Sequence, residues 1–81
     1  MAAFSAQERA LLLAVKGVGP TVIRRLEEAG ISDFPTLAEQ DAGVLSREIA
    51  ARLGGTCWRN SPLARAALTG AIVAAREALK A

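Results

Sequence analysis

The chain has 81 residues, enough for one small domain but not for a second hydrophobic core. About half of the residues are hydrophobic (52%), and only Phe4, Phe34 and Trp58 are aromatic. Ten basic and eight acidic side chains give a net charge of +2, and there is no histidine and one cysteine, Cys57. This inventory excludes an internal disulfide and a zinc site of the usual Cys/His type.

Charge is unevenly distributed along the chain. Residues 1–43 carry four basic and six acidic side chains, whereas residues 44–81 carry six basic and two acidic ones. Any long-range attraction of a polyanion is therefore expected to come from the second half. The first residues lack a signal-peptide pattern, and no window approaches the roughly 20 apolar residues of a membrane span. We expect a cytoplasmic protein with no membrane partner.

The first part of the chain predicts two helices joined by a tight turn. Ser5 followed by Glu8 indicates a capping box, and so a helix that runs to residue 14 or 15. Residues 16–19 contain two glycines around one valine, which lets the backbone turn sharply. Pro20 is suited to a first helical turn and Gly30 to a helix end, which predicts a second helix over residues 20–29.

The second predicted helix has one apolar face, formed by Val22, Ile23, Leu26 and Ala29. Ile31 is expected to fold back onto the same core. On the opposite side Arg24 and Glu28 have the i,i+4 spacing that favours an ion pair.

The remaining sequence predicts a short helix and two longer ones. A turn or short helix is expected to begin at Pro35. Asp41 is expected to cap a helix over residues 42–53 that Gly54 and Gly55 end. The apolar side of that helix would consist of Val44, Leu45, Ile49 and Leu53. Residues 54–60 are predicted to form a loop that contains Cys57 and Trp58, and Ser61 and Pro62 to start a helix ending near Leu79.

Residues 15–31 resemble the helix-hairpin-helix motif of DNA repair, recombination and replication proteins. The resemblance rests on the apolar lead-in, the Gly17-Val18-Gly19 turn, Leu26 seven residues after the second glycine, and the Gly30-Ile31 ending. Residues 33–38 are similar to the segment that often follows the motif in double helix-hairpin-helix domains. The whole chain is similar to small bacterial proteins that are little more than one such domain.

The resemblance implies a single all-α domain over residues 1–81, a compact bundle of four to five short helices. The motif would occupy residues 10–31, and residues 42–79 would pack against it. Each half has the order helix, glycine-containing connection, proline-started helix. A degenerate double helix-hairpin-helix (SAM-like) domain therefore stays open as an alternative.

In that family, backbone N–H groups of the hairpin contact DNA phosphates without reading bases. The positions carried over to this chain are Lys16, Gly17, Val18, Gly19, Thr21, Val22, Arg24 and Arg25. The backbone donors would be Gly17, Gly19, Thr21 and Val22, with charge supplied by Lys16 and Arg25. The family commonly has lysine or serine where this chain has Thr21, so the charge is weaker here but the amide geometry is kept. Some members also hold a monovalent cation on hairpin carbonyls, which would be those of Leu13, Val15 and Val18.

The last predicted helix offers a second candidate surface. One side of this helix, within about 60° on a helical wheel, carries Arg65, Thr69, Arg76 and Lys80. This stripe is either a second DNA or partner surface or an ordinary solvated face. On another side Ala66, Gly70 and Ala74 form a ridge of small residues, which either packs internally or serves a dimer or protein partner.

The sequence therefore favours non-sequence-specific DNA binding through phosphate contacts. The alternative is a protein-interaction or dimerisation module that uses the final helix and the Trp58 loop. An enzyme is not expected, because histidine is absent and no carboxylates cluster on one face; Cys57 lacks a histidine partner for catalysis. No cofactor is expected other than the monovalent cation named above.

Overall fold

The computed structural model describes residues 3–54 and 61–80, which form five helices and no strand. The helices are α1 (Ala6–Leu13), α2 (Pro20–Glu28), α3 (Phe34–Ala38), α4 (Ala42–Leu53) and α5 (Pro62–Lys80). The all-α prediction is confirmed, and each helix limit lies within two residues of the expected one. Cys57, Trp58 and the loop predicted around them lie outside the described residues.

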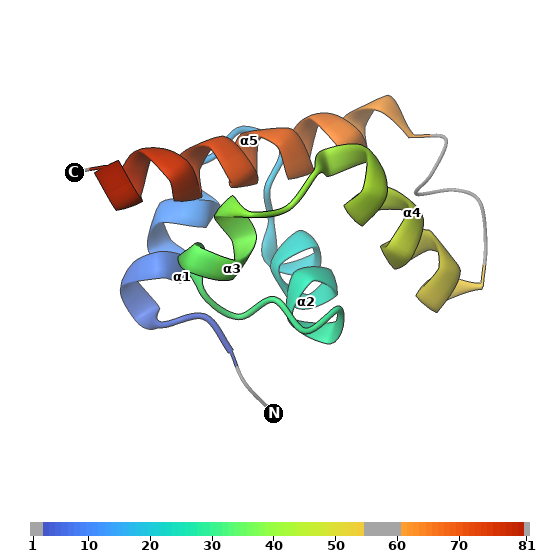
Figure 1. Cartoon of the computed structure of the whole chain (residues 1–81), viewed down its shortest axis with the longest axis horizontal. Helices are drawn as coiled ribbons and strands as arrows, with labels where there is room; N and C mark the ends of the chain where they lie inside the picture. Colours follow the sequence, from blue (N-terminus) through green and yellow to red (C-terminus); the bar gives the residue numbers. More distant parts are fainter. Residues whose placement is uncertain (1–2, 55–60, 81) are drawn as a thin grey trace.

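The long helix α5 organises the packing of the others. It runs along the long axis of the molecule, and the other helices lie on one side of it (Figure 1). It contacts α1, α3 and α4. The core beneath it consists mainly of buried aliphatic side chains, among them Leu12, Ile23, Leu26, Leu37, Leu45, Ile49, Leu68 and Ile72. The interior is thus built from all five helices.

Four of these helices begin at a side-chain cap. Ser5, Asp33, Asp41 and Ser61 each accept a hydrogen bond from the backbone N–H three residues later. The hydroxyl and the backbone N–H of Thr36 both stabilise the Asp33 carboxylate and hold its pKa below the ordinary value. The capping box predicted for α1 is confirmed, because the Glu8 carboxylate also accepts the N–H of Ser5 at 3.1 Å.

Two glutamates connect separate segments of the first half. Glu8 accepts the N–H of Phe34 at 3.0 Å, and Glu27 accepts the N–H of Phe4 at the same distance. The two phenylalanine rings lie with their centroids 6.4 Å apart. Two of the six carboxylates of the first half are therefore used to position backbone.

The end of α2 has the geometry expected from its glycine. Gly30 has φ +87°, and its N–H donates to the Glu27 carbonyl at 3.0 Å. The N–H of Ile31 reaches back to the Leu26 carbonyl at 2.9 Å, completing a Schellman motif. Ile31 is buried, as predicted.

The apolar side predicted for α4 is wrong in part. Its buried residues are Leu45, Ser46, Ile49 and Ala50, whereas Val44 and Leu53 are about 40% exposed (43% and 41%). At about 100° per residue, Val44 lies outside the side of α4 that carries the four buried residues, so it faces solvent. Leu53 lies on the buried side but is the last residue of the helix, and it is partly exposed there.

Candidate functional site

Residues 14–19, named here the glycine turn, join α1 to α2. Gly17 has φ +86°, a conformation that favours glycine. The N–H of Val18 closes the turn by donating to the Val15 carbonyl at 3.0 Å, and the Val18 side chain is buried. Val18 therefore holds the turn to the core and offers neither its side chain nor its N–H to a ligand.

The start of α2 differs from that of the other four helices because no side chain caps it. Its N-cap residue is Gly19, which has no side chain to cap with, and Pro20 occupies the first helical position. Among the described residues, the N–H groups of Gly17, Gly19, Thr21 and Val22 have no hydrogen-bond partner. The first turn of α2 carries no acidic residue. The backbone thus presents several free donors at the positive end of a helix dipole.

The glycine turn is seated on α5. A Cβ added to Gly17 would lie 3.6 Å from the Ala67 Cβ, and one added to Gly70 would lie 2.8 Å from a methyl carbon of Val15. At Gly70 the small-residue ridge of α5 therefore packs internally. These contacts hold Val15 and Gly17 of the glycine turn against α5.

The basic side chains near the turn differ in how free they are to contact a ligand. Lys16 and Arg24 are exposed, and Thr21 is exposed beside them. The predicted Arg24–Glu28 pair is wrong, because Glu28 pairs with Arg25 at 2.9 Å. Residues three apart on a helix are neighbours just as residues four apart are. Arg25 is also less exposed than Arg24. Arg24 is therefore better placed than Arg25 to reach a ligand.

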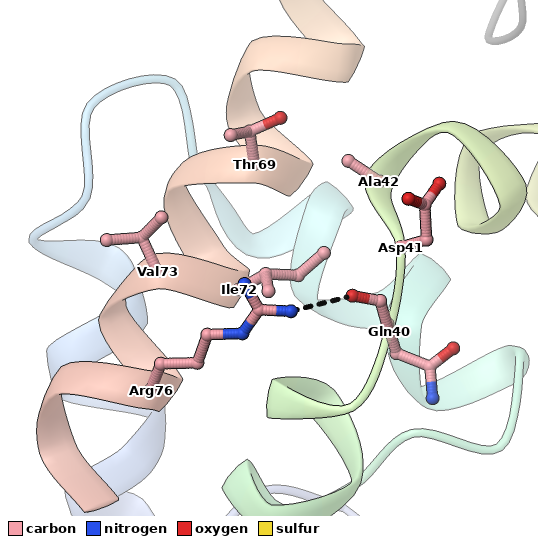
Figure 2. Close-up of a pocket in the computed structure, with 7 residues that line it drawn as sticks. All are labelled: Gln40, Asp41, Ala42, Thr69, Ile72, Val73 and Arg76. Atoms are coloured by element: carbon pink, nitrogen blue, oxygen red, sulfur yellow. Dashed lines mark hydrogen bonds between the residues drawn. The ribbon is translucent and has the colours of Figure 1, made fainter. Parts of the chain in front are cut away.

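The residues of the stripe predicted on α5 have different surroundings in the structure. Arg76 donates from Nε to the Ala38 carbonyl at 2.9 Å and from a terminal nitrogen to the Gln40 carbonyl at 3.4 Å. Figure 2 shows its guanidinium directed at the backbone between α3 and α4, in a hollow that Thr69 also lines. Arg76 thus ties α5 to that connection. Thr69 donates its hydroxyl to the Arg65 carbonyl at 2.9 Å, and Lys80 is exposed at the end of α5.

A hollow beside the glycine turn was not expected from the sequence. It has a volume of about 610 Å³ and is lined by Lys16, Gly17, Leu63, Ala66 and Ala67. We name it the turn groove. Its walls come from two segments about 50 residues apart, so only their three-dimensional packing brings them together. The glycines and alanines at the contact were the one sequence signal for it.

The cation position suggested by the resemblance remains a prediction. Of the three carbonyls, that of Val15 accepts the Val18 N–H. Within the part of the chain that the structure describes, no three or more His, Cys, Asp or Glu side chains form a group that could hold a metal ion.

No protein-family model, curated protein or solved structure matches this chain. Of the helices in residues 3–54 and 61–80, none combines the length and apolar character needed to cross a membrane. Function is therefore inferred from the glycine turn and its surroundings.

Proposed function

We propose that the chain binds DNA without sequence specificity, through phosphate contacts at the glycine turn and the start of α2. In this proposal residues 10–31 form a helix-hairpin-helix motif. The order of α4, a glycine-containing connection and the proline-started α5 repeats that of α1 and α2, which supports a degenerate second copy. Because backbone N–H groups contact phosphate and not base edges, such binding carries no sequence information.

The uncapped start of α2 carries this proposal. An isolated nine-residue helix normally gains from a side-chain cap, and every other described helix has one. Here the N–H groups of Thr21 and Val22 are left for an external acceptor. A phosphate oxygen is the acceptor that suits both the donors and the helix dipole.

The surrounding charge is compatible with a phosphate. Lys16, which precedes the uncapped start in the chain, and Arg24, which follows it, are both exposed. Two of the acidic side chains of the first half are engaged elsewhere: Glu8 and Glu27 hold the backbone of Phe34 and Phe4. The net negative charge of residues 1–43 is thus not concentrated on the donors.

Substitution of Gly19 tests this mechanism directly. Gly19 has φ −121° and a Cβ added to it meets nothing within 4 Å, so larger residues fit without strain. In Gly19→Asp the new carboxylate would accept the free N–H groups of α2 and repel a phosphate. We expect duplex DNA affinity, measured by fluorescence anisotropy, to fall about 10- to 100-fold. Thermal stability should stay equal or rise slightly.

Gly19→Ala and Gly19→Ser are the matched controls. The alanine variant adds a Cβ but leaves the donors free, so it should bind DNA like the parent. The serine variant occupies a donor without adding charge and should fall between the two. If the aspartate and alanine variants bind DNA equally well, phosphate does not sit at the start of α2 and the proposal is wrong.

A further inference from the structure

Leu63 is the most exposed of the large apolar side chains in the described residues, at 84%. It lies in the first turn of α5 and lines the turn groove together with Lys16 and Gly17. The small residues Ala66 and Ala67 line the same groove. A bulky exposed apolar side chain therefore stands at a hollow that small apolar residues and the backbone of the glycine turn also line.

The electrostatic surroundings of the turn groove favour an anionic occupant. α2 and α5 are the two described helices with no carboxylate at the N-cap or in the first turn, since α5 is capped by Ser61. Lys16 stands at the groove itself, and the Gly17 N–H has no partner among the described residues. A neutral apolar protein surface would leave this N–H and the Lys16 ammonium unpaired, whereas a phosphodiester would satisfy them.

We propose that the turn groove receives a nucleotide of the DNA strand whose phosphate is held at the glycine turn, with Leu63 inserted against an unstacked base. The inference rests on the proposed function and adds a preference for one form of DNA. The groove volume of about 610 Å³ lies within the range of ordinary ligand sites. The sugar and base would cover Ala66 and Ala67, and the phosphate would face Lys16.

This arrangement discriminates against intact duplex. Apolar side chains that enter a base stack must first separate neighbouring bases, which is unfavourable where stacking is complete. At a one-nucleotide gap the stack is already interrupted, so the same contact is made at lower cost. The chain should therefore bind gapped DNA more tightly than an otherwise identical continuous duplex.

Leu63→Ala removes the inserted side chain, and Leu79→Ala is the matched control on the same helix. Leu79 is also an exposed leucine (52%), near the far end of α5 and outside the turn groove. Each protein is titrated by fluorescence anisotropy against one labelled duplex, with and without a central one-nucleotide gap. A 2-aminopurine beside the gap reports insertion through its fluorescence. Because Leu63 is exposed, its truncation should not disturb the fold.

We expect the parent and Leu79→Ala to prefer the gapped duplex by roughly tenfold, the effect of burying part of one leucine side chain. Leu63→Ala should lose this preference and the 2-aminopurine response. Equal binding of both DNA forms by the parent, or a preference that survives in Leu63→Ala, would overturn the insertion while leaving phosphate binding intact. A parent that binds neither DNA fails at the proposed function. If Leu63→Ala instead changes the molecular mass in sedimentation, the groove is a contact between copies of the chain and the inference is wrong.

Discussion

Gly70 lies closer to another segment than any other glycine that the structure describes. A Cβ at position 70 would stand 2.8 Å from a Val15 methyl carbon, closer than real Cβ contacts. Gly70 is conformationally unfavourable within α5, so its presence there is explained by this approach. A bulky residue at Gly70 would consequently disturb the packing of the glycine turn on α5. Such a substitution could therefore not test whether the small-residue ridge of α5 forms a dimer contact.

A double-mutant cycle at Gly70 and Val15 tests the contact. In the Val15→Ala background, Gly70→Ala should raise the free energy of unfolding by about 1 kcal/mol, because helix propensity improves and space is available. In the parent background the same change meets Val15, and overpacking of about 1–3 kcal/mol opposes the gain. Urea denaturation of the four proteins should give a coupling energy between about 0.5 and 3 kcal/mol. If Gly70→Ala has the same effect in both backgrounds, the two residues do not touch.

At the scale of single residues, the sequence predicted poorly which charged side chains are free to bind a ligand. It paired Glu28 with Arg24, but Glu28 pairs with Arg25. Both spacings bring side chains together on a helix, so the choice depends on how each arginine lies against the rest of the protein. Arg76 likewise looks like a solvated charge in sequence, and only the packing of α5 beside α3 gives it the carbonyls of Ala38 and Gln40.

The starts and ends of the helices were far more predictable, because their signals are local. Ser5, Asp41 and Ser61 cap the helices that they were expected to cap, and Gly30 and Gly54 adopt positive φ at helix ends. A cap needs only the residue itself and the next few along the chain. Which residues of α4 are buried depends on how the rest of the protein packs against it, and there the prediction was right for Leu45 and Ile49 but wrong for Val44 and Leu53.

The Asp33 cap gives α3 a pH-dependent start. Bonding from Thr36 lowers the pKa of Asp33 in the folded protein, so the carboxylate stabilises the fold above its unfolded pKa and ceases to do so as pH falls through the lowered value. Asp33→Asn keeps a capping oxygen but cannot titrate. Thermal melts from neutral pH down to about pH 3 should show the parent losing melting temperature relative to the variant as acid is added. A constant difference across this range would mean that the Asp33 carboxylate contributes nothing through its charge.

At the scale of the whole molecule, the sequence did not predict which distant segments pack against each other. The helix order followed from local signals, and the compact all-α bundle was what the resemblance implied. The turn groove did not, because it joins residues 16–17 to residues 63–67 through the packing of α5. Once the structure is known, the small residues of the glycine turn and of α5 explain why the two pack closely. In the sequence alone, small residues do not specify which segment they pack against.

The distribution of charge over α5 leads to the last prediction. At 100° per residue, the stripe of Arg65, Thr69, Arg76 and Lys80 is centred roughly 120° from the side of α5 that faces the glycine turn. One DNA strand held at the turn would therefore not run along the stripe, even though the second half of the chain holds most of the positive charge. The cations that matter should be those beside the turn, Lys16 and Arg24.

Charge reversal on the two sides of α5 should separate these surfaces. For Lys16→Glu we expect weaker duplex binding and a slope of log affinity against log salt that is smaller by about 0.9, the value for one phosphate contact. Lys80→Glu makes the same change in net charge at an exposed position at the far end of α5, and it should change affinity much less and leave the slope unaltered. Anisotropy titrations over a series of salt concentrations measure both quantities. If Lys80→Glu lowers the slope as much as Lys16→Glu does, DNA contacts the stripe as well, and a footprint confined to the glycine turn and its groove is too small.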